Sequence, residues 1–173
     1  MDNVSEVFPC VVKERPLQKT VQGQSFELVF HSNSNGVRMA LRDVVDHLEA
    51  AKIPNLSIDE IELALAEVLN NIVEHAYDFD DAGVIILRLK VDTPKVYWQV
   101  IDEGGEMPKE GLPPGHLVDL GTSLHSLPEG GFGWFIIRKL VQDIHYKRVE
   151  GKNILSFISS TEQRANASSI GAT

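Results

Sequence analysis

The chain has little of three features that would assign it to a common class of protein. Cys10 is the only cysteine among its 173 residues, which excludes an intrachain disulfide and a metal site built from several cysteines. No apolar run approaches the ~20 residues that a membrane-spanning helix requires. The chain has 16 Lys and Arg against 25 Asp and Glu and a net charge of −9, without a basic patch. We therefore expect it to bind neither nucleic acid nor an anionic membrane.

The rest of the composition is that of an ordinary globular protein, with 43% hydrophobic and 24% charged residues. The N-terminus is acidic and lacks the basic and apolar regions of a signal peptide, so we expect a cytoplasmic protein. We divide the chain into an N-terminal extension over residues 1–24, with room for an edge strand at 8–13, one domain over 25–160, and a flexible tail over 161–173.

Helical and strand patterns alternate along the central region. This alternation predicts a two-layer α/β sandwich, in which a mixed sheet carries its helices on one face. A long stretch rich in Gly and Pro, residues 103–131, is typical of a functional lid. The predicted strands are 25–31, 84–91, 95–101, 144–149 and 153–159, and the predicted helices are 37–50, 57–77 and 132–142.

The strongest of these helical patterns also contains a polar stripe. Apolar residues recur at three- and four-residue steps from Ile58 to Ala76 and define its inward face. Glu67, Asn71 and His75 follow at four-residue intervals, so they stack along another stripe of the same helix. A carboxylate one turn before a carboxamide suits a site where Asn ligates Mg²⁺ and Glu accepts a proton. A solvated helix face has the same spacing, and the motifs downstream decide between the two interpretations.

Two glycine motifs follow this helix. Asp102 ends a predicted strand, where a carboxylate can accept a hydrogen bond from the amino group of a base such as adenine, and Gly104 leaves room for a flat ring. A type I turn uses the same two residue types. Gly131 and Gly133 open a predicted helix, where free N–H groups and the helix dipole favour phosphate. A flexible loop before an ordinary helix is the alternative.

The order of the three motifs resembles the ATP-binding fold shared by gyrases, heat-shock-90 chaperones, sensor histidine kinases and mismatch-repair ATPases. Within this superfamily of histidine kinase-like ATPases, the sequence is most similar to the anti-sigma-factor serine kinases of bacteria. The resemblance covers about residues 25–160 and rests on three motifs whose spacing fits one template. The segments that carry it are 67–77, 102–108 and 130–143.

The resemblance implies that the cofactors are ATP and Mg²⁺, and it implies a role for each motif. Asn71 would hold Mg²⁺ against the phosphates of ATP. Asp102 would bind adenine, and Gly104 would make room for the base. Gly131 and Gly133 would line the phosphates.

The resemblance also implies a reaction and its partners. Glu67 would take the proton from an incoming serine hydroxyl as the γ-phosphate transfers. Independently of the resemblance, the hydroxyls of Thr122 and Ser123 in the lid are candidates for contacting phosphate, although ordinary loops carry such hydroxyls as well. The protein would sequester a sigma factor and phosphorylate its antagonist, a small anti-anti-sigma domain. A homodimer fits the same family, and so does docking of a protein partner at Arg38 and Arg42, although solvated arginines on a helix would have the same pattern.

One departure from the family pattern keeps other functions open. No Lys or Arg occurs between Glu110 and Ile137, so this part of the lid offers no cation for the γ-phosphate. A nucleotide-gated module that binds a partner without catalysis is therefore an alternative. A detached catalytic domain of the histidine-kinase type is another, and it would need a separate phosphoacceptor helix.

Overall fold

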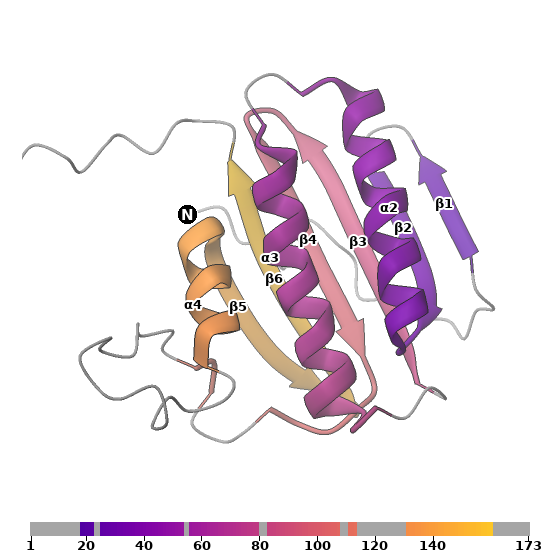
Figure 1. The fold of residues 1–173 in the computed structure, drawn as a ribbon, viewed down its shortest axis with the longest axis vertical. Helices are drawn as coiled ribbons and strands as arrows, with labels where there is room; N and C mark the ends of the chain where they lie inside the picture. Colours follow the sequence, from indigo (N-terminus) through magenta and orange to yellow (C-terminus); the bar gives the residue numbers. More distant parts are fainter. Residues whose placement is uncertain are drawn as a thin grey trace, which may run out of the picture.

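The helices of this protein lie on one face of a single sheet, as seen in a computed structural model (Figure 1). The expected two-layer α/β sandwich is therefore confirmed. The predicted strand at 8–13 lies outside the described residues, as do Thr122 and Ser123. The structure describes residues 18–22, 25–53, 56–79, 83–107, 111–113 and 131–160.

The sheet has the strand order β1-β2-β3-β4-β6-β5, and every neighbouring pair is antiparallel. The prediction of a mixed sheet was wrong in this respect. A helix carries the chain from β4 toward β5 at the far edge, and β5 runs parallel to β4 without pairing with it. β6 returns between these two strands and is antiparallel to both. The strands are β1 (Gln18–Gln22), β2 (Ser25–His31), β3 (Val84–Asp92), β4 (Lys95–Asp102), β5 (Gln142–Val149) and β6 (Lys152–Ser160).

The helices begin where their sequences offer capping side chains. Asn33 accepts a hydrogen bond from a backbone N–H of the first turn of α2, and Ser57 does the same for α3, which satisfies N–H groups that lack a partner within the helix. A helix long and apolar enough to cross a membrane is not found in the described part of the chain. The helices are α2 (Ser34–Ala51), α3 (Ile58–Asn71), its π-helical continuation η1 (Ile72–Ala76) and α4 (Gly131–Leu140).

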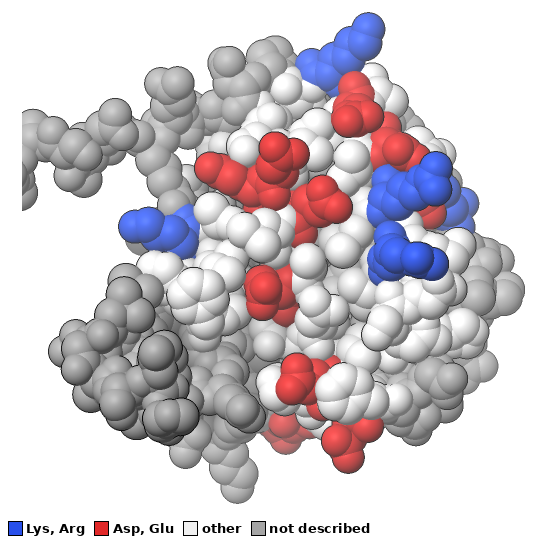
Figure 2. Space-filling view, viewed as in Figure 1, with Lys and Arg blue, Asp and Glu red and all other residues white. Residues whose placement is uncertain are grey.

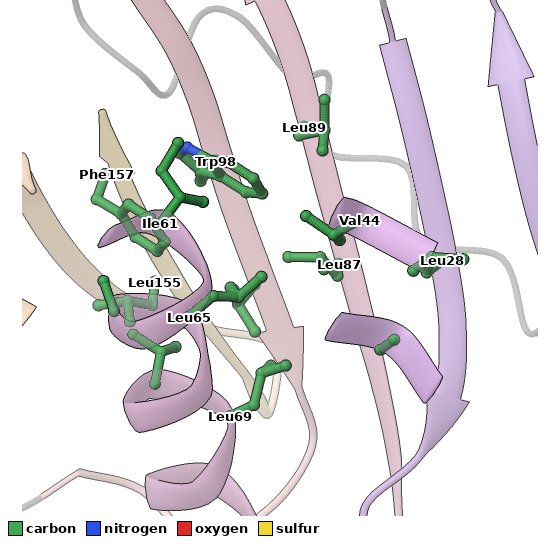
Figure 3. Packing of buried hydrophobic residues seen from close by; sticks show 14 of the residues in the cluster. Leu28, Val44, Ile61, Leu65, Leu69, Leu87, Leu89, Trp98, Leu155 and Phe157 are labelled. Atoms are coloured by element: carbon green, nitrogen blue, oxygen red, sulfur yellow. The ribbon is translucent and has the colours of Figure 1, made fainter. Parts of the chain in front are cut away.

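The hydrophobic core lies between the sheet and the helices (Figure 3). Leu65 and Leu69 of α3 are fully buried and point toward the sheet. Trp98 and Phe157 stack on neighbouring strands, with ring centroids 5.9 Å apart. Burying each such side chain contributes about 1.5–3 kcal/mol. Because these apolar positions fix the rotation of α3, its polar stripe faces α4 and the space beside it.

Candidate functional site

A cavity of about 450 Å³ opens between α3, α4 and the adjoining ends of β4 and β6. Its walls are mostly apolar and include Ile72 and Trp134. Asn71, Asp102 and Asn153 contribute polar groups to the same space. Small-molecule sites typically have volumes of ~300–1,000 Å³ and combine apolar walls with a few convergent polar groups. The cavity has this character.

Asp102 ends β4 and is almost fully buried, with 4% of its surface exposed. Its Oδ1 accepts hydrogen bonds from the Gly104 N–H at 2.9 Å and from Asn153 Nδ2 at 2.8 Å. Asp102 lines the cavity, and its other oxygen, Oδ2, has no donor among the described residues. Burial raises the pKa of the Asp102 carboxyl, whereas its two hydrogen bonds and the nearby charge of Arg148 act in the opposite direction.

Gly104 lies where the loop after β4 meets the end of the α3 helix. The wider π-helical turn at Ile72–Ala76 presents the Ala76 carbonyl to this loop, and the Gly105 N–H donates to it at 2.6 Å. A Cβ atom at Gly104 would lie 2.5 Å from the same carbonyl oxygen. Only glycine allows this approach of the two backbones. π-helical turns are found frequently at functional sites.

Gly104→Ala is therefore expected to lower the free energy of unfolding by about 1–3 kcal/mol, because the added methyl must displace the Ala76 carbonyl. Urea denaturation measures this change. Gly105→Ala is the matched control, since its Cβ would lie 3.4 Å from the same oxygen and should cost much less. Equal losses in the two variants would contradict the close approach at Gly104.

Glu67 and Asn71 lie one turn apart on α3 and face the first turn of α4. A Cβ atom at Gly133 would lie 2.6 Å from Glu67 Oε2 and 3.8 Å from Asn71 Nδ2. Glycine at this position thus lets α4 begin directly beside both polar side chains.

The Asn71 side chain is available to a ligand. Its Nδ2 is buried and has no hydrogen-bond partner among the described residues. Leaving such a group unsatisfied costs about 1–3 kcal/mol, which a bound ligand would recover. The two ends of a carboxamide are nearly indistinguishable in shape, so rotation of the amide by half a turn presents its oxygen instead.

The positive charge beside the cavity is engaged by protein groups, since Arg148 donates to Asn153 Oδ1 and to the Gly104 carbonyl. Figure 2 shows acidic side chains gathered over α3, and the cavity-lining residues in the described part of the chain include no Lys or Arg. Arg138 of α4 donates instead to the carbonyl oxygens of Pro113, at 2.7 Å, and Leu112, at 3.3 Å. The described lining thus supplies no cationic side chain to an anion in the cavity.

Predicted site residues from distant segments meet at this cavity. Gly131 is the first residue of α4, while Thr122 and Ser123 lie outside the described residues. Of the predicted residues, Asn71 and Asp102 line the cavity, Gly104 donates to Asp102, and Gly133 lies against Glu67 and Asn71.

Three side chains near the site were missed by sequence reasoning. Asn153 pairs in register with Asp102 across β4 and β6, and no local pattern marks it. Tyr146 and Arg148 of β5 donate to Asn153 Oδ1 at 2.8 and 2.6 Å. Tyr146 and Arg148 are two residues apart in a predicted strand, so the sequence places them on the same face of it. Nothing else in the sequence indicates that they lie near the site.

Comparison with known proteins identifies relatives of this arrangement. A family model described as a histidine kinase-like ATPase domain matches residues 30–159. Serine-protein kinase RsbW of Listeria monocytogenes serotype 4a is 27% identical over 120 residues, which cover 66% of this chain and 74% of the relative. A protein of the same name from Bacillus cereus is 29% identical over 102 residues, which cover 57% of this chain and 61% of the relative.

Two solved structures align with the chain at a TM-score of 0.47 each. The blue-light activated histidine kinase of Erythrobacter litoralis EL346 is 19% identical; the alignment covers 73% of this chain and 41% of that kinase. The catalytic domain of histidine kinase ThkA is 17% identical, and the alignment covers 84% of this chain and 98% of that domain.

Proposed function

This chain belongs to the histidine kinase-like ATPase domain family, and we propose that it is an ATP-dependent serine kinase that sequesters a sigma factor and phosphorylates an anti-anti-sigma antagonist. One observation carries the proposal: the unpartnered Asn71 amide and the Asp102 carboxylate, with one oxygen free of donors among the described residues, line the same cavity. The relatives named serine-protein kinase support the reaction. The partners follow from the resemblance to anti-sigma-factor kinases.

The adenine base would bind at Asp102. Its free Oδ2 accepts a hydrogen bond, which suits the amino group of adenine and disfavours the carbonyl oxygen that guanine carries at the same place. Gly104 keeps the adjoining backbone free of a side chain, and Ile72 and Trp134 supply apolar surface for the ring. The site therefore favours adenine over guanine.

Asn71 fits a Mg²⁺ ion that is held mainly by phosphates and water. Magnesium prefers oxygen ligands and commonly takes only one or two from the protein, and the amide of Asn71 has no competing partner among the described residues. When bound with ATP, the ion supplies positive charge that neutralises the phosphates. The cavity lining itself has no Lys or Arg in the described part of the chain.

Glu67 would act as the general base beside the phosphates. Gly133 lies against its carboxylate in the first turn of α4, where backbone N–H groups and the helix dipole favour an anion. In the transfer, the serine oxygen bonds to the γ-phosphorus, and the bond between that phosphorus and the β–γ bridging oxygen breaks. Glu67 takes the hydroxyl proton, and the products are ADP and phosphoserine.

Incubation with Mg-ATP and an anti-anti-sigma domain tests the proposed reaction. We expect phosphoserine on that domain, detected by mass spectrometry. ATP binding without transfer to any partner would overturn the kinase and favour the second candidate, a nucleotide-gated binding module. The commitment of Arg138 to the Leu112 and Pro113 carbonyls is the observation that favours this alternative, because that cation is then not available to a γ-phosphate.

The affinity for ATP is expected to fall as the pH drops through the pKa of Asp102. Only the ionised carboxylate offers Oδ2 purely as an acceptor to the adenine amino group. Because burial raises the pKa of this carboxyl, the loss should begin above the ordinary aspartate value of about 3.9. Purine riboside triphosphate lacks the amino group but has the same phosphates, so its affinity should change less over the same range. Parallel profiles for the two nucleotides would contradict the assignment.

A further inference from the structure

We propose that Tyr146, Arg148 and Asn153 form a clamp that acts through Asp102 to set the selectivity of the cavity for the adenine amino group. The same clamp holds the loop at residues 103–107 against the β5–β6 hairpin. The inference rests on the proposed binding of ATP. It assigns these three side chains as positioning residues, which orient the carboxylate that contacts the base.

Both ends of the Asn153 side-chain amide are hydrogen-bonded to other groups of the protein. Its Nδ2 donates to Asp102 Oδ1 at 2.8 Å and to the Gly105 carbonyl at 2.9 Å. Its Oδ1 accepts from the Tyr146 hydroxyl at 2.8 Å and from Arg148 Nη1 at 2.6 Å. Turning the amide over would set its NH₂ group against the guanidinium and its oxygen against the carboxylate. Tyr146 and Arg148 therefore fix the orientation in which Asn153 donates to Asp102.

This fixed donor determines which oxygen of Asp102 is free. Oδ1 already accepts from Asn153 and from the Gly104 N–H, while Oδ2 has no donor among the described residues. An unrestrained carboxylate can rotate and adopt several orientations, which weakens any single hydrogen bond. The clamp holds the unpaired oxygen, Oδ2, in one place. Because this acceptor is fixed, a nucleotide that carries the adenine amino group binds more tightly than one that lacks it.

The same three side chains also hold the backbone of the loop that follows Asp102. Arg148 Nη1 donates to the Gly104 carbonyl at 3.1 Å, and Asn153 binds the next carbonyl along the chain. The Tyr146 hydroxyl accepts from the Met107 N–H at 3.1 Å while donating to Asn153. One hydroxyl thus connects the loop with the amide that orients Asp102, so its removal tests the clamp by deleting a single oxygen atom.

Tyr146→Phe removes this hydroxyl and keeps the ring in the cavity wall. Calorimetry in Mg²⁺ would give Kd values for ATP and for purine riboside triphosphate, which lacks the amino group. The wild-type protein should bind ATP about 10- to 100-fold more tightly than the analogue, as expected for a hydrogen bond to a charged group. The variant should lower this ratio by about fivefold or more. Its affinity for the analogue should stay within about twofold, because the analogue does not use the oriented oxygen.

Tyr97→Phe is the matched control. It removes a hydroxyl from β4, and Tyr97 lies on the sheet face away from the helices, since Val96 and Trp98 on either side of it belong to the core. In Tyr97→Phe, the ratio of the affinities for ATP and purine riboside triphosphate should equal that of the wild-type protein. Arg148→Gln gives a second route to the clamp and should lower the ratio as well, and Arg148→Lys, which keeps the charge and a donor, should restore part of it.

The outcomes separate the clamp from the proposed function. An unchanged ratio in both Tyr146→Phe and Arg148→Gln, with ATP still bound, would overturn the clamp and leave ATP binding intact. Equal weakening of both nucleotides would also overturn it, because general damage to the cavity has that effect. A wild-type protein that binds neither nucleotide would overturn the proposed function itself.

Discussion

Glu67→Gln is expected to lower the rate of phosphate transfer to serine by about 10²–10⁴-fold, the usual contribution of a positioned general base. Glutamine has nearly the same shape but cannot take the hydroxyl proton. ATP affinity should stay within about twofold, because the proton is accepted only as transfer occurs. Single-turnover transfer of labelled phosphate to an anti-anti-sigma domain measures the rate, and calorimetry measures the affinity.

Glu74→Gln is the control for this variant. Glu74 lies on the continuation of the same helix, is exposed, and does not line the cavity. Neutralising it removes an equal charge from the acidic surface and should leave transfer unchanged. If Glu67→Gln kept the wild-type rate, or if both variants lost it equally, Glu67 would not be the general base.

Asp102→Asn is expected to weaken ATP binding by about 10- to 100-fold while the protein stays folded. The asparagine oxygen can still accept from the Gly104 N–H and from Asn153, as Oδ1 of the aspartate does. Its NH₂ group would replace the free acceptor and meet the adenine amino group donor to donor, which removes a charge-assisted hydrogen bond. Circular dichroism checks the fold, and titration with Mg-ATP measures the affinity.

Asp92→Asn provides the same chemical change at an exposed strand end, outside the cavity lining. Its affinity for ATP should equal that of the wild-type protein. If Asp102→Asn bound ATP as tightly as this control, the adenine would not be read by that carboxylate. If Asp102→Asn also weakened purine riboside triphosphate to the same extent, the amino group would not be the group recognised.

The local part of the site could be predicted from the sequence because it follows from helical periodicity. The apolar steps in α3 fix which face packs on the sheet, and they leave Glu67 and Asn71 on a different stripe. Gly104 and Gly133 were singled out as positions that leave room for a base and for phosphate. Within the protein, the groups that an added Cβ would meet there are the Ala76 carbonyl and the Glu67 carboxylate, and these two contacts were not predicted. Asp102 was singled out because a carboxylate at the end of a strand can accept a hydrogen bond from a base.

Other features depend on contacts between distant segments, which a local pattern does not encode. Asn153 is near Asp102 only because β6 inserts between β4 and β5, and the same insertion makes the sheet antiparallel throughout. The short, polar edge strand Gln18–Gln22 has no alternating apolar face to mark it. The π-helical turn after Asn71 makes a contact with the distant Gly105 through the Ala76 carbonyl, and residue preference does not predict such a turn.

Calorimetric titration of the wild-type protein with ATP, with and without Mg²⁺, tests whether the cavity binds this nucleotide. If Asn71, Asp102 and the start of α4 surround one cleft for a purine triphosphate and its divalent ion, one ATP should bind per chain. This binding should be saturable and should tighten when Mg²⁺ is present. Absence of saturable binding, or binding of the same strength to GTP, would contradict this expectation.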